Sequence, residues 1–169
     1  MLTIAVATVW LVAPAGAATP YCGIMWGSLA KSASPMTAAP VTGVRTGQHS
    51  CYDRLVVDLA GAPEPGYFVR YVSQVVQEGS GEPIPLRGGA FIQVSVLAPA
   101  SAAYHPSNPR EAAAVTGFRT FRQVAFAGSF EGRTQFGLGV RARLPFRVFT
   151  LPGPGAGSRL VVDVAHRWS

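Results

Sequence analysis

Arg54-Leu-Val-Val-Asp-Leu-Ala60 is the stretch of this chain that indicates the fold most clearly. Its apolar residues alternate, with Leu55, Val57 and Leu59 on one side, which is the pattern of a half-buried β-strand. A second stretch, Arg159-Leu-Val-Val-Asp-Val-Ala165, agrees with it at six of seven positions. The two copies are too far apart for a short-period solenoid. Their shared Arg and Asp favour two equivalent strands in a pseudo-symmetric pair of sheets over two strands that merely follow the same alternation.

The same alternation predicts further strands at 67–76, 90–96, 121–130 and 140–149. Clusters of Gly and Pro, which are typical of turns, separate these segments. One short helix is predicted at 108–115, with Pro109 in its first turn. Residues 23–40 and 98–108 are expected to be irregular loops. We therefore predict an all-β fold, an antiparallel β-sandwich or flattened barrel with one short helix at most.

The composition narrows the class of protein. Charged residues make up 13% of the 169 residues and hydrophobic residues 49%, with 19 Gly and 14 Pro. This mixture excludes a coiled coil and a highly charged disordered chain, and it argues against a helix bundle. The net charge is +6, and Lys31 is the single lysine among the basic residues. One small, arginine-rich β domain is the class that remains.

The N-terminal segment has the features of an export signal. Leu2–Val12 is apolar and uncharged, and Ala15 and Ala17 form the A-x-A pattern that precedes a cleavage site. We predict a signal peptide at 1–17, although no Lys or Arg precedes its apolar run. A membrane anchor is the alternative, but a spanning helix needs about 20 apolar residues and this run is shorter. The mature protein is expected to be secreted.

Cys22 and Cys51 are the two cysteines of the chain. In an exported protein, an even number of cysteines indicates a disulfide. The bond would tie an N-terminal extension at 18–40 to a β domain at 41–169. Two free thiols are one alternative, and a metal site with His49 is another, although the companion ligands of a tetrahedral site are missing. We expect no metal and no cofactor.

The sequence offers little chemistry for catalysis. It contains no H-E-x-x-H motif, no G-x-S-x-G elbow and no phosphate-binding loop. Asp58 and Asp163 each follow an arginine by four residues, Arg54 and Arg159, and are expected to form structural charge pairs on a strand face or between strands. A glycosidase needs two carboxylates across a cleft, which Asp58 and Asp163 supply only in a minor alternative. We expect that the protein is not an enzyme.

Arginines are the candidate binding residues. Arg141, Arg143 and Arg147 are expected to share one face of the predicted 140–149 strand, and Arg133 lies just upstream. A row of guanidinium groups holds carboxylates or phosphates in bidentate fashion, whereas the alternative is a solvated face. For an exported protein the anionic partners are cell-wall polymers or lipid headgroups. Nucleic acid is not expected, because it would need stacking aromatics on the same face.

Several motifs follow one another along nearly the whole mature chain. They are Cys22-Gly-Ile-Met-Trp-Gly-Ser28, Val44-Arg-Thr-Gly-Gln-His-Ser-Cys-Tyr-Asp-Arg54 with Leu-Val-Val-Asp58 after it, Gly66-Tyr67 with Tyr71-Val72, Gly128-Ser-Phe-Glu-Gly132, Gly137-Leu-Gly-Val-Arg141 and Arg159-Leu-Val-Val-Asp-Val-Ala-His166. Their order and spacing resemble the AMIN-like family of secreted actinobacterial proteins, which is similar to the AMIN domain.

The resemblance implies a pair of packed antiparallel sheets and a role at the cell envelope. AMIN domains target peptidoglycan amidases and secretion-pore proteins, bind cell-wall glycan and are not catalytic. We therefore expect a non-catalytic envelope domain that binds peptidoglycan or another anionic wall polymer through Arg133, Arg141, Arg143 and Arg147. No catalytic domain follows in this sequence, so any cargo is expected to be a separate partner. The alternatives are an interaction module of an envelope complex, served by the Pro-rich loop at 152–157, and a wall-acting hydrolase using Asp58, Asp163 or Glu131.

Overall fold

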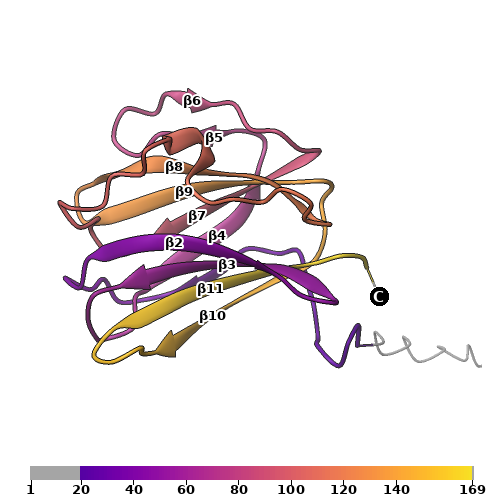
Figure 1. The fold of residues 1–169 in the computed structure, drawn as a ribbon, viewed down its shortest axis with the longest axis horizontal. Coiled ribbons are helices and arrows are strands. Elements are labelled where there is room, and N and C mark those ends of the chain that lie inside the picture. The colour runs from indigo at the N-terminus through magenta and orange to yellow at the C-terminus, as the bar shows by residue number, and fades with distance from the viewer. Residues whose placement is uncertain (1–19, 169) are drawn as a thin grey trace, which may run out of the picture.

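Two antiparallel β-sheets lie face to face in the computed structural model, which describes residues 20–168 (Figure 1). The predicted sandwich is therefore confirmed. The predicted signal peptide at 1–17 lies outside the described residues. No helix in the part of the chain that the structure describes is long and apolar enough to cross a membrane.

Within residues 20–168, nine strands form the two sheets. The five-stranded sheet contains β1 (Lys31–Ala33), β4 (Tyr67–Val72), β7 (Ala90–Val96), β9 (Arg133–Val140) and β8 (Phe121–Phe130), in that spatial order. The four-stranded sheet contains β10 (Phe146–Pro152), β11 (Ser158–Ala165), β3 (Tyr52–Leu59) and β2 (Val41–Gln48). Outside the sheets lie a short hairpin, β5 (Val75–Val76) and β6 (Pro83–Ile84), and one turn of 3-10 helix, η1 (Pro109–Glu111). The predicted helix thus begins at its proline but ends after one turn.

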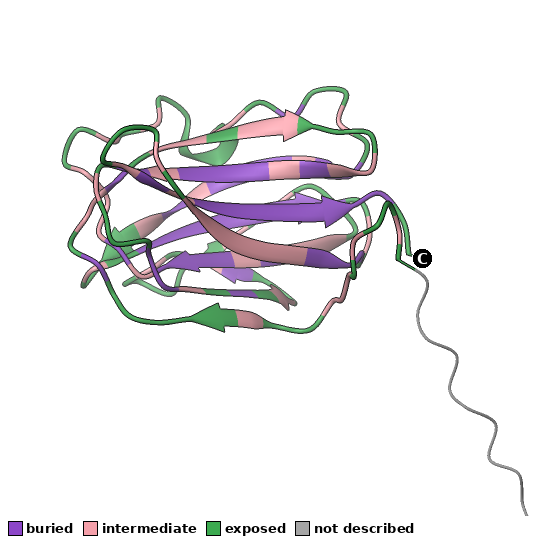
Figure 2. Cartoon of the chain, turned by 90° about the horizontal axis from the view of Figure 1, so that it is seen from below, coloured by how far each residue is buried: buried purple, intermediate pink, exposed green. Residues whose placement is uncertain are grey.

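The core fills the space between the two sheets. Figure 2 shows that buried residues concentrate on the strands in the interior of the sandwich. The side chains with no exposed surface include Leu55, Val57, Ile92, Val94, Phe136, Leu138, Leu160 and Val162. Burial of each such side chain contributes about 1.5–3 kcal/mol relative to leaving it in water. In β3, β7 and β11 the side chains that point into the core are the alternating apolar residues from which these strands were predicted.

The two copies of the repeated stretch are neighbours in the same sheet. β3 pairs with β11 in antiparallel fashion, with Val56 opposite Val161. This register places Arg54 opposite Asp163, and the Arg of the second copy opposite the Asp of the first. The prediction that the copies occupy equivalent places in two sheets is therefore wrong. A local two-fold axis between adjacent strands relates them instead.

The predicted strand at 140–149 is also wrong. β9 ends at Val140, the chain turns over residues 141–145, and β10 begins at Phe146 in the other sheet. The alternation continues through this segment because the residues on either side of the turn both contribute apolar side chains to the core. Periodicity alone does not reveal that the chain crosses between the sheets.

Residues 73–89, which we call the covering segment, lie directly on the outward face of β8 and β9. A Cβ atom at Gly139 would overlap the carbonyl oxygen of Arg87, and one at Gly137 would lie 3.0 Å from Val75. The glycines of β9 therefore permit a close approach that no other residue allows. The same glycines interrupt the apolar alternation, which is why β9 was not predicted as a strand.

Residues 20–40, which we call the N-terminal strap, connect the edges of the two sheets. Cys22 is bonded to Cys51, so the predicted disulfide is confirmed. The backbone N–H of Phe146 in β10 donates to the carbonyl of Gly27 at 2.9 Å. Further along, β1 pairs with β4, so the expectation of an irregular loop is wrong at this strand.

Candidate functional site

The outward face of the five-stranded sheet is only partly covered. The covering segment lies on β8 and β9, whereas the surface over β1, β4 and β7 forms an open groove of about 620 Å³. Ser32 and Ser34 of the strap line one side, and Glu78 of the covering segment also lines the groove. The groove is therefore built from segments that are far apart in sequence.

Outward-facing residues of three strands form the floor of the groove. They are Phe68 and Arg70 of β4, Gln93 and Ser95 of β7, and Arg133 and Gln135 of β9. The side chain of Gln135 is held from both ends. Its Oε1 accepts a hydrogen bond from Ser95 Oγ at 3.1 Å, and its Nε2 donates to the carbonyl of Val76. The centre of the floor therefore carries a fixed polar group of the kind that orients a ligand in a binding site.

The two arginines of the groove form no ion pairs among the described residues. Arg70 and Arg133 are exposed, and neither forms an ion pair within residues 20–168. The guanidinium of Arg70 lies 5.0 Å from the ring centroid of Phe68, which is itself exposed. An aromatic face, amides and guanidinium groups with open donors suit a polar ligand that carries carboxylates.

The four arginines predicted to bind a ligand do not form one row. Arg133 lines the groove. Arg141 and Arg143 lie in the turn between the sheets, and Arg147 lies on β10. The row was expected on a strand at 140–149 that does not exist, so the common face is lost. Ligand binding by each of these residues stays a prediction.

Asp163 lies at the centre of an ion-pair cluster on the outward face of the four-stranded sheet. The carboxylate has no exposed surface. It accepts from Arg54 (Nε to Oδ1 2.7 Å, Nη2 to Oδ2 2.9 Å) and from Arg147 (Nε to Oδ2 2.8 Å). The hydrogen bond to Asp163 raises the pKa of Arg54. The guanidinium of Arg147 also lies within 5.4 Å of three ring centroids, those of Trp26, Tyr52 and Phe149.

At the other end of β3 and β11, Arg159 lies opposite Asp58, but each of them has a different partner. Asp58 accepts from Arg45 of β2 (Nε to Oδ2 2.8 Å, Nη2 to Oδ1 3.0 Å). Arg159 donates instead to the carbonyl of Pro152 at 2.9 Å. Both Asp58 and Asp163 are therefore held by arginines, and Asp163 is closed to a substrate. Arg159, which was expected to take part in these charge pairs, forms none within residues 20–168.

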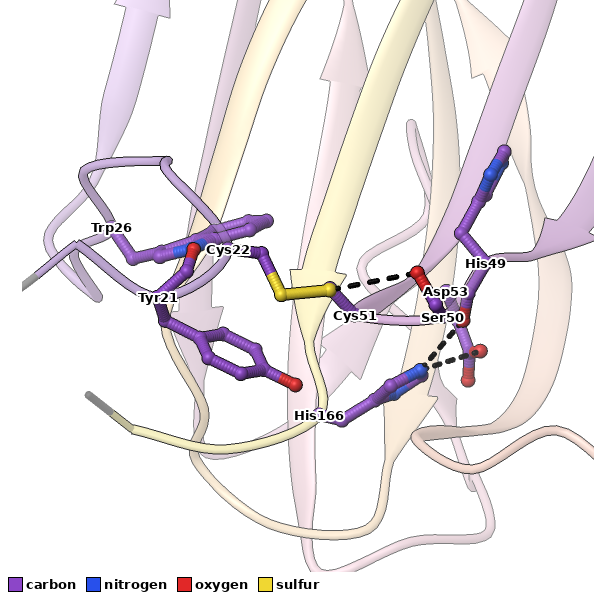
Figure 3. The surroundings of a disulfide bond; sticks show 8 residues. All are labelled: Tyr21, Cys22, Trp26, His49, Ser50, Cys51, Asp53 and His166. Atoms are coloured by element: carbon purple, nitrogen blue, oxygen red, sulfur yellow. Dashed lines mark hydrogen bonds and ion pairs between the residues drawn. A yellow bond between two sulfur atoms is a disulfide. The ribbon is translucent and has the colours of Figure 1, made fainter.

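A buried Asp–His cluster closes one end of the sandwich, and the sequence did not predict it. Oδ2 of Asp53 accepts from the backbone N–H groups of Thr120 (2.6 Å) and Phe121 (2.9 Å). Nδ1 of the His166 ring lies 2.9 Å from Thr120 Oγ1. On the other side of the ring, Nε2 lies 2.9 Å from the carbonyl oxygen of His49 (Figure 3). These contacts join the start of β3, the end of β11 and the start of β8. Asp53 and Thr120 have no exposed surface, so the cluster connects the sheets and does not face a substrate.

The disulfide lies beside this cluster (Figure 3). The backbone N–H of His166 donates to the carbonyl of Cys51 at 2.9 Å. Because both sulfurs are bonded to each other, the alternatives of two free thiols and of a metal site at Cys51 with His49 are wrong. Across residues 20–168, no group of three His, Cys, Asp or Glu side chains is placed to hold a metal ion.

A family model described as the AMIN-like domain matches residues 39–166. The matched range contains every strand except β1, and so it includes the floor of the groove but not its β1 side. No curated protein and no solved structure matches the chain.

Proposed function

The chain belongs to the AMIN-like family, and from this premise we propose that it is a non-catalytic envelope domain that binds peptidoglycan in the groove on its five-stranded sheet. AMIN-like domains are associated with peptidoglycan. The disulfide supports a location outside the cytoplasm, because such bonds persist in oxidising compartments. The finer assignment, direct binding of the glycan strand or its peptide stems, rests on the chemistry of the groove.

The groove is the observation that carries the proposal. Peptidoglycan presents hydroxyl and acetamido groups on its sugars and carboxylates on its peptide stems. The amide of Gln93 is suited to the acetamido and hydroxyl groups, and the ring of Phe68 to the apolar face of a sugar. Arg70 and Arg133 lack ion-pair partners among the described residues, which leaves their fork-shaped guanidinium groups for carboxylates.

The distribution of carboxylates supports binding without hydrolysis. Hydrolysis of a glycosidic bond generally uses two carboxylates on either side of the bond. Glu78 is the single carboxylate among the described residues that line the groove. Asp58 and Asp163 face away from it on the other sheet, each hydrogen-bonded to arginine. Release of soluble muropeptides from purified wall, abolished by Glu78→Gln, would replace this proposal with an enzymatic one.

Co-sedimentation with insoluble peptidoglycan tests the proposal. Arg70→Glu combined with Arg133→Glu is expected to weaken binding at least about tenfold, equivalent to about 1.4 kcal/mol. The matched control combines Arg119→Glu with Arg110→Glu, because both of these arginines are exposed and lie outside the groove. Binding that falls equally in the control variant would show a general charge effect, and binding that is unchanged in the groove variant would exclude the groove as the site.

A further inference from the structure

The end of the sandwich that carries both ends of the described chain has a second exposed surface. Figure 1 shows the first described residues and the C-terminus at the same end of the molecule. The guanidinium of Arg167 lies 4.9 Å from the ring centroid of Tyr21. This contact joins the two ends of the described chain. We call the surface formed by Leu29, Trp168, Arg141, Arg143 and Arg167 the terminal patch.

Two large apolar side chains of the terminal patch face solvent. Leu29 is 79% exposed and Trp168 is 51% exposed. The indole N–H of Trp168 donates to the carbonyl of Arg143 at 3.1 Å, and Arg143 Nη2 donates to the carbonyl of Ser28 at 3.4 Å. These two bonds place Trp168 near the strap residue next to Leu29. Because the polar atom of Trp168 already has a partner, its exposed surface is the apolar part of the ring.

The charge around these side chains is positive. Arg141, Arg143 and Arg167 are all exposed. The acidic residues that adjoin this end, Asp53 and Asp163, have no exposed surface and are hydrogen-bonded inside the protein. Exposed apolar side chains among cations are the pattern of proteins that lie on a membrane surface, where the rings enter the interface and the cations contact lipid phosphates.

The sequence before the described residues also points to a membrane as the partner. The apolar stretch Leu2–Val12 precedes the strap in the sequence, and Tyr21 near the start of the strap contacts Arg167 at this end. The export signal predicted at 1–17 would enter the membrane during secretion and, before its cleavage, would bring the terminal patch to the bilayer. We propose that the terminal patch docks the protein on an anionic bilayer, with Trp168 and Leu29 in the interface. This inference is independent of the groove.

Vesicle co-sedimentation of the exported protein tests the inference. We expect binding to vesicles of phosphatidylglycerol and phosphatidylcholine in equal parts and little binding to phosphatidylcholine alone. Leu29→Ser combined with Trp168→Ser is expected to weaken binding at least about tenfold, and Arg167→Gln about fivefold. Every variant keeps the same N-terminus, so any contribution from the residues before Pro20 that remain after export is common to all.

Met36→Ser combined with Phe130→Ser is the matched control, because these side chains are 50% and 52% exposed and lie outside the patch. The control variant is expected to bind vesicles as the unmodified protein does. Equal binding to both vesicle types, or equal losses in the patch and control variants, would overturn the inference. Binding that survives the Leu29 and Trp168 changes but disappears with added salt would also overturn it, because that result shows adsorption by charge alone.

Discussion

The two outward faces of the sandwich use arginine in opposite ways. On the four-stranded sheet, Arg54 and Arg147 both bind the buried carboxylate of Asp163, so both guanidinium groups are held in ion pairs within the protein. On the five-stranded sheet, Arg70 and Arg133 lie in an open groove without an ion pair among the described residues. An arginine-rich sequence therefore does not by itself define a binding surface. The partners that the fold supplies decide which arginines hold the structure and which are left for a ligand.

The largest expected effect is at the face whose arginines form ion pairs, that of the four-stranded sheet. Asp163→Asn leaves two partly buried arginines without their carboxylate and is expected to lower the free energy of unfolding by about 3–5 kcal/mol. Urea denaturation followed by circular dichroism measures the loss. A loss below about 1 kcal/mol would mean that this cluster contributes no more than a surface ion pair, and the contrast between the faces would disappear.

Removal of the disulfide is expected to have the next largest effect. Cys22 and Cys51 are separated by 29 residues, and closing a loop of this length stabilises a protein by about 3–4 kcal/mol on the chain-entropy model. The double variant Cys22→Ser with Cys51→Ser loses this constraint and frees the strap, which places Trp26 against Arg147. Denaturation of the oxidised protein and of the variant gives the difference, and equal stability of the two would show that the strap is held without the bond.

Asp58 offers a smaller test of the repeated sequence. Its side chain is 27% exposed and that of its partner Arg45 is 55% exposed. Asp58→Asn is therefore expected to cost at most about 1 kcal/mol, and less in high salt. The comparison with Asp163→Asn uses the same substitution at the equivalent position of the two strands. Similar losses at both positions would show that the sequence repeat, and not the surroundings, determines the contribution of each carboxylate.

The smallest effect on stability is expected in the groove. Arg70→Gln and Arg133→Gln remove exposed charges that hold no internal partner in the described chain, and each is expected to change the free energy of unfolding by no more than about 0.5 kcal/mol. The same denaturation experiment measures the change. A loss of about 2 kcal/mol would show that these arginines are structural, which would remove the distinction between the two faces.

The strands that the sequence predicted are those whose alternation is uninterrupted. β7 and β8 have the predicted bounds, 90–96 and 121–130, and β3 and β11 overlap the repeated stretches. β2 and β9 were missed because each contains two glycines. In β9 these glycines serve the close approach of the covering segment, a tertiary contact that no local pattern encodes.

Of the residues that line the groove, the sequence pointed to one as a ligand-binding candidate. Arg133 was a candidate, but Phe68, Arg70 and Gln93 were not, although they occupy the polar side of strands that the sequence predicted. Their alternation with core residues was a signal that each side chain points outward. What was missing was the spatial order β4-β7-β9, which joins strands that are separate in sequence.

Nuclear magnetic resonance of the side-chain amides tests the central claim, that the groove is the peptidoglycan site, most directly. Soluble muropeptides added to labelled protein are expected to shift the amide signal of Gln93 in the groove. The signal of Gln48, at the end of β2 in the other sheet, is expected to stay in place. Shifts at Gln48 without a change at Gln93 would contradict the account, because the wall polymer would then bind outside the groove.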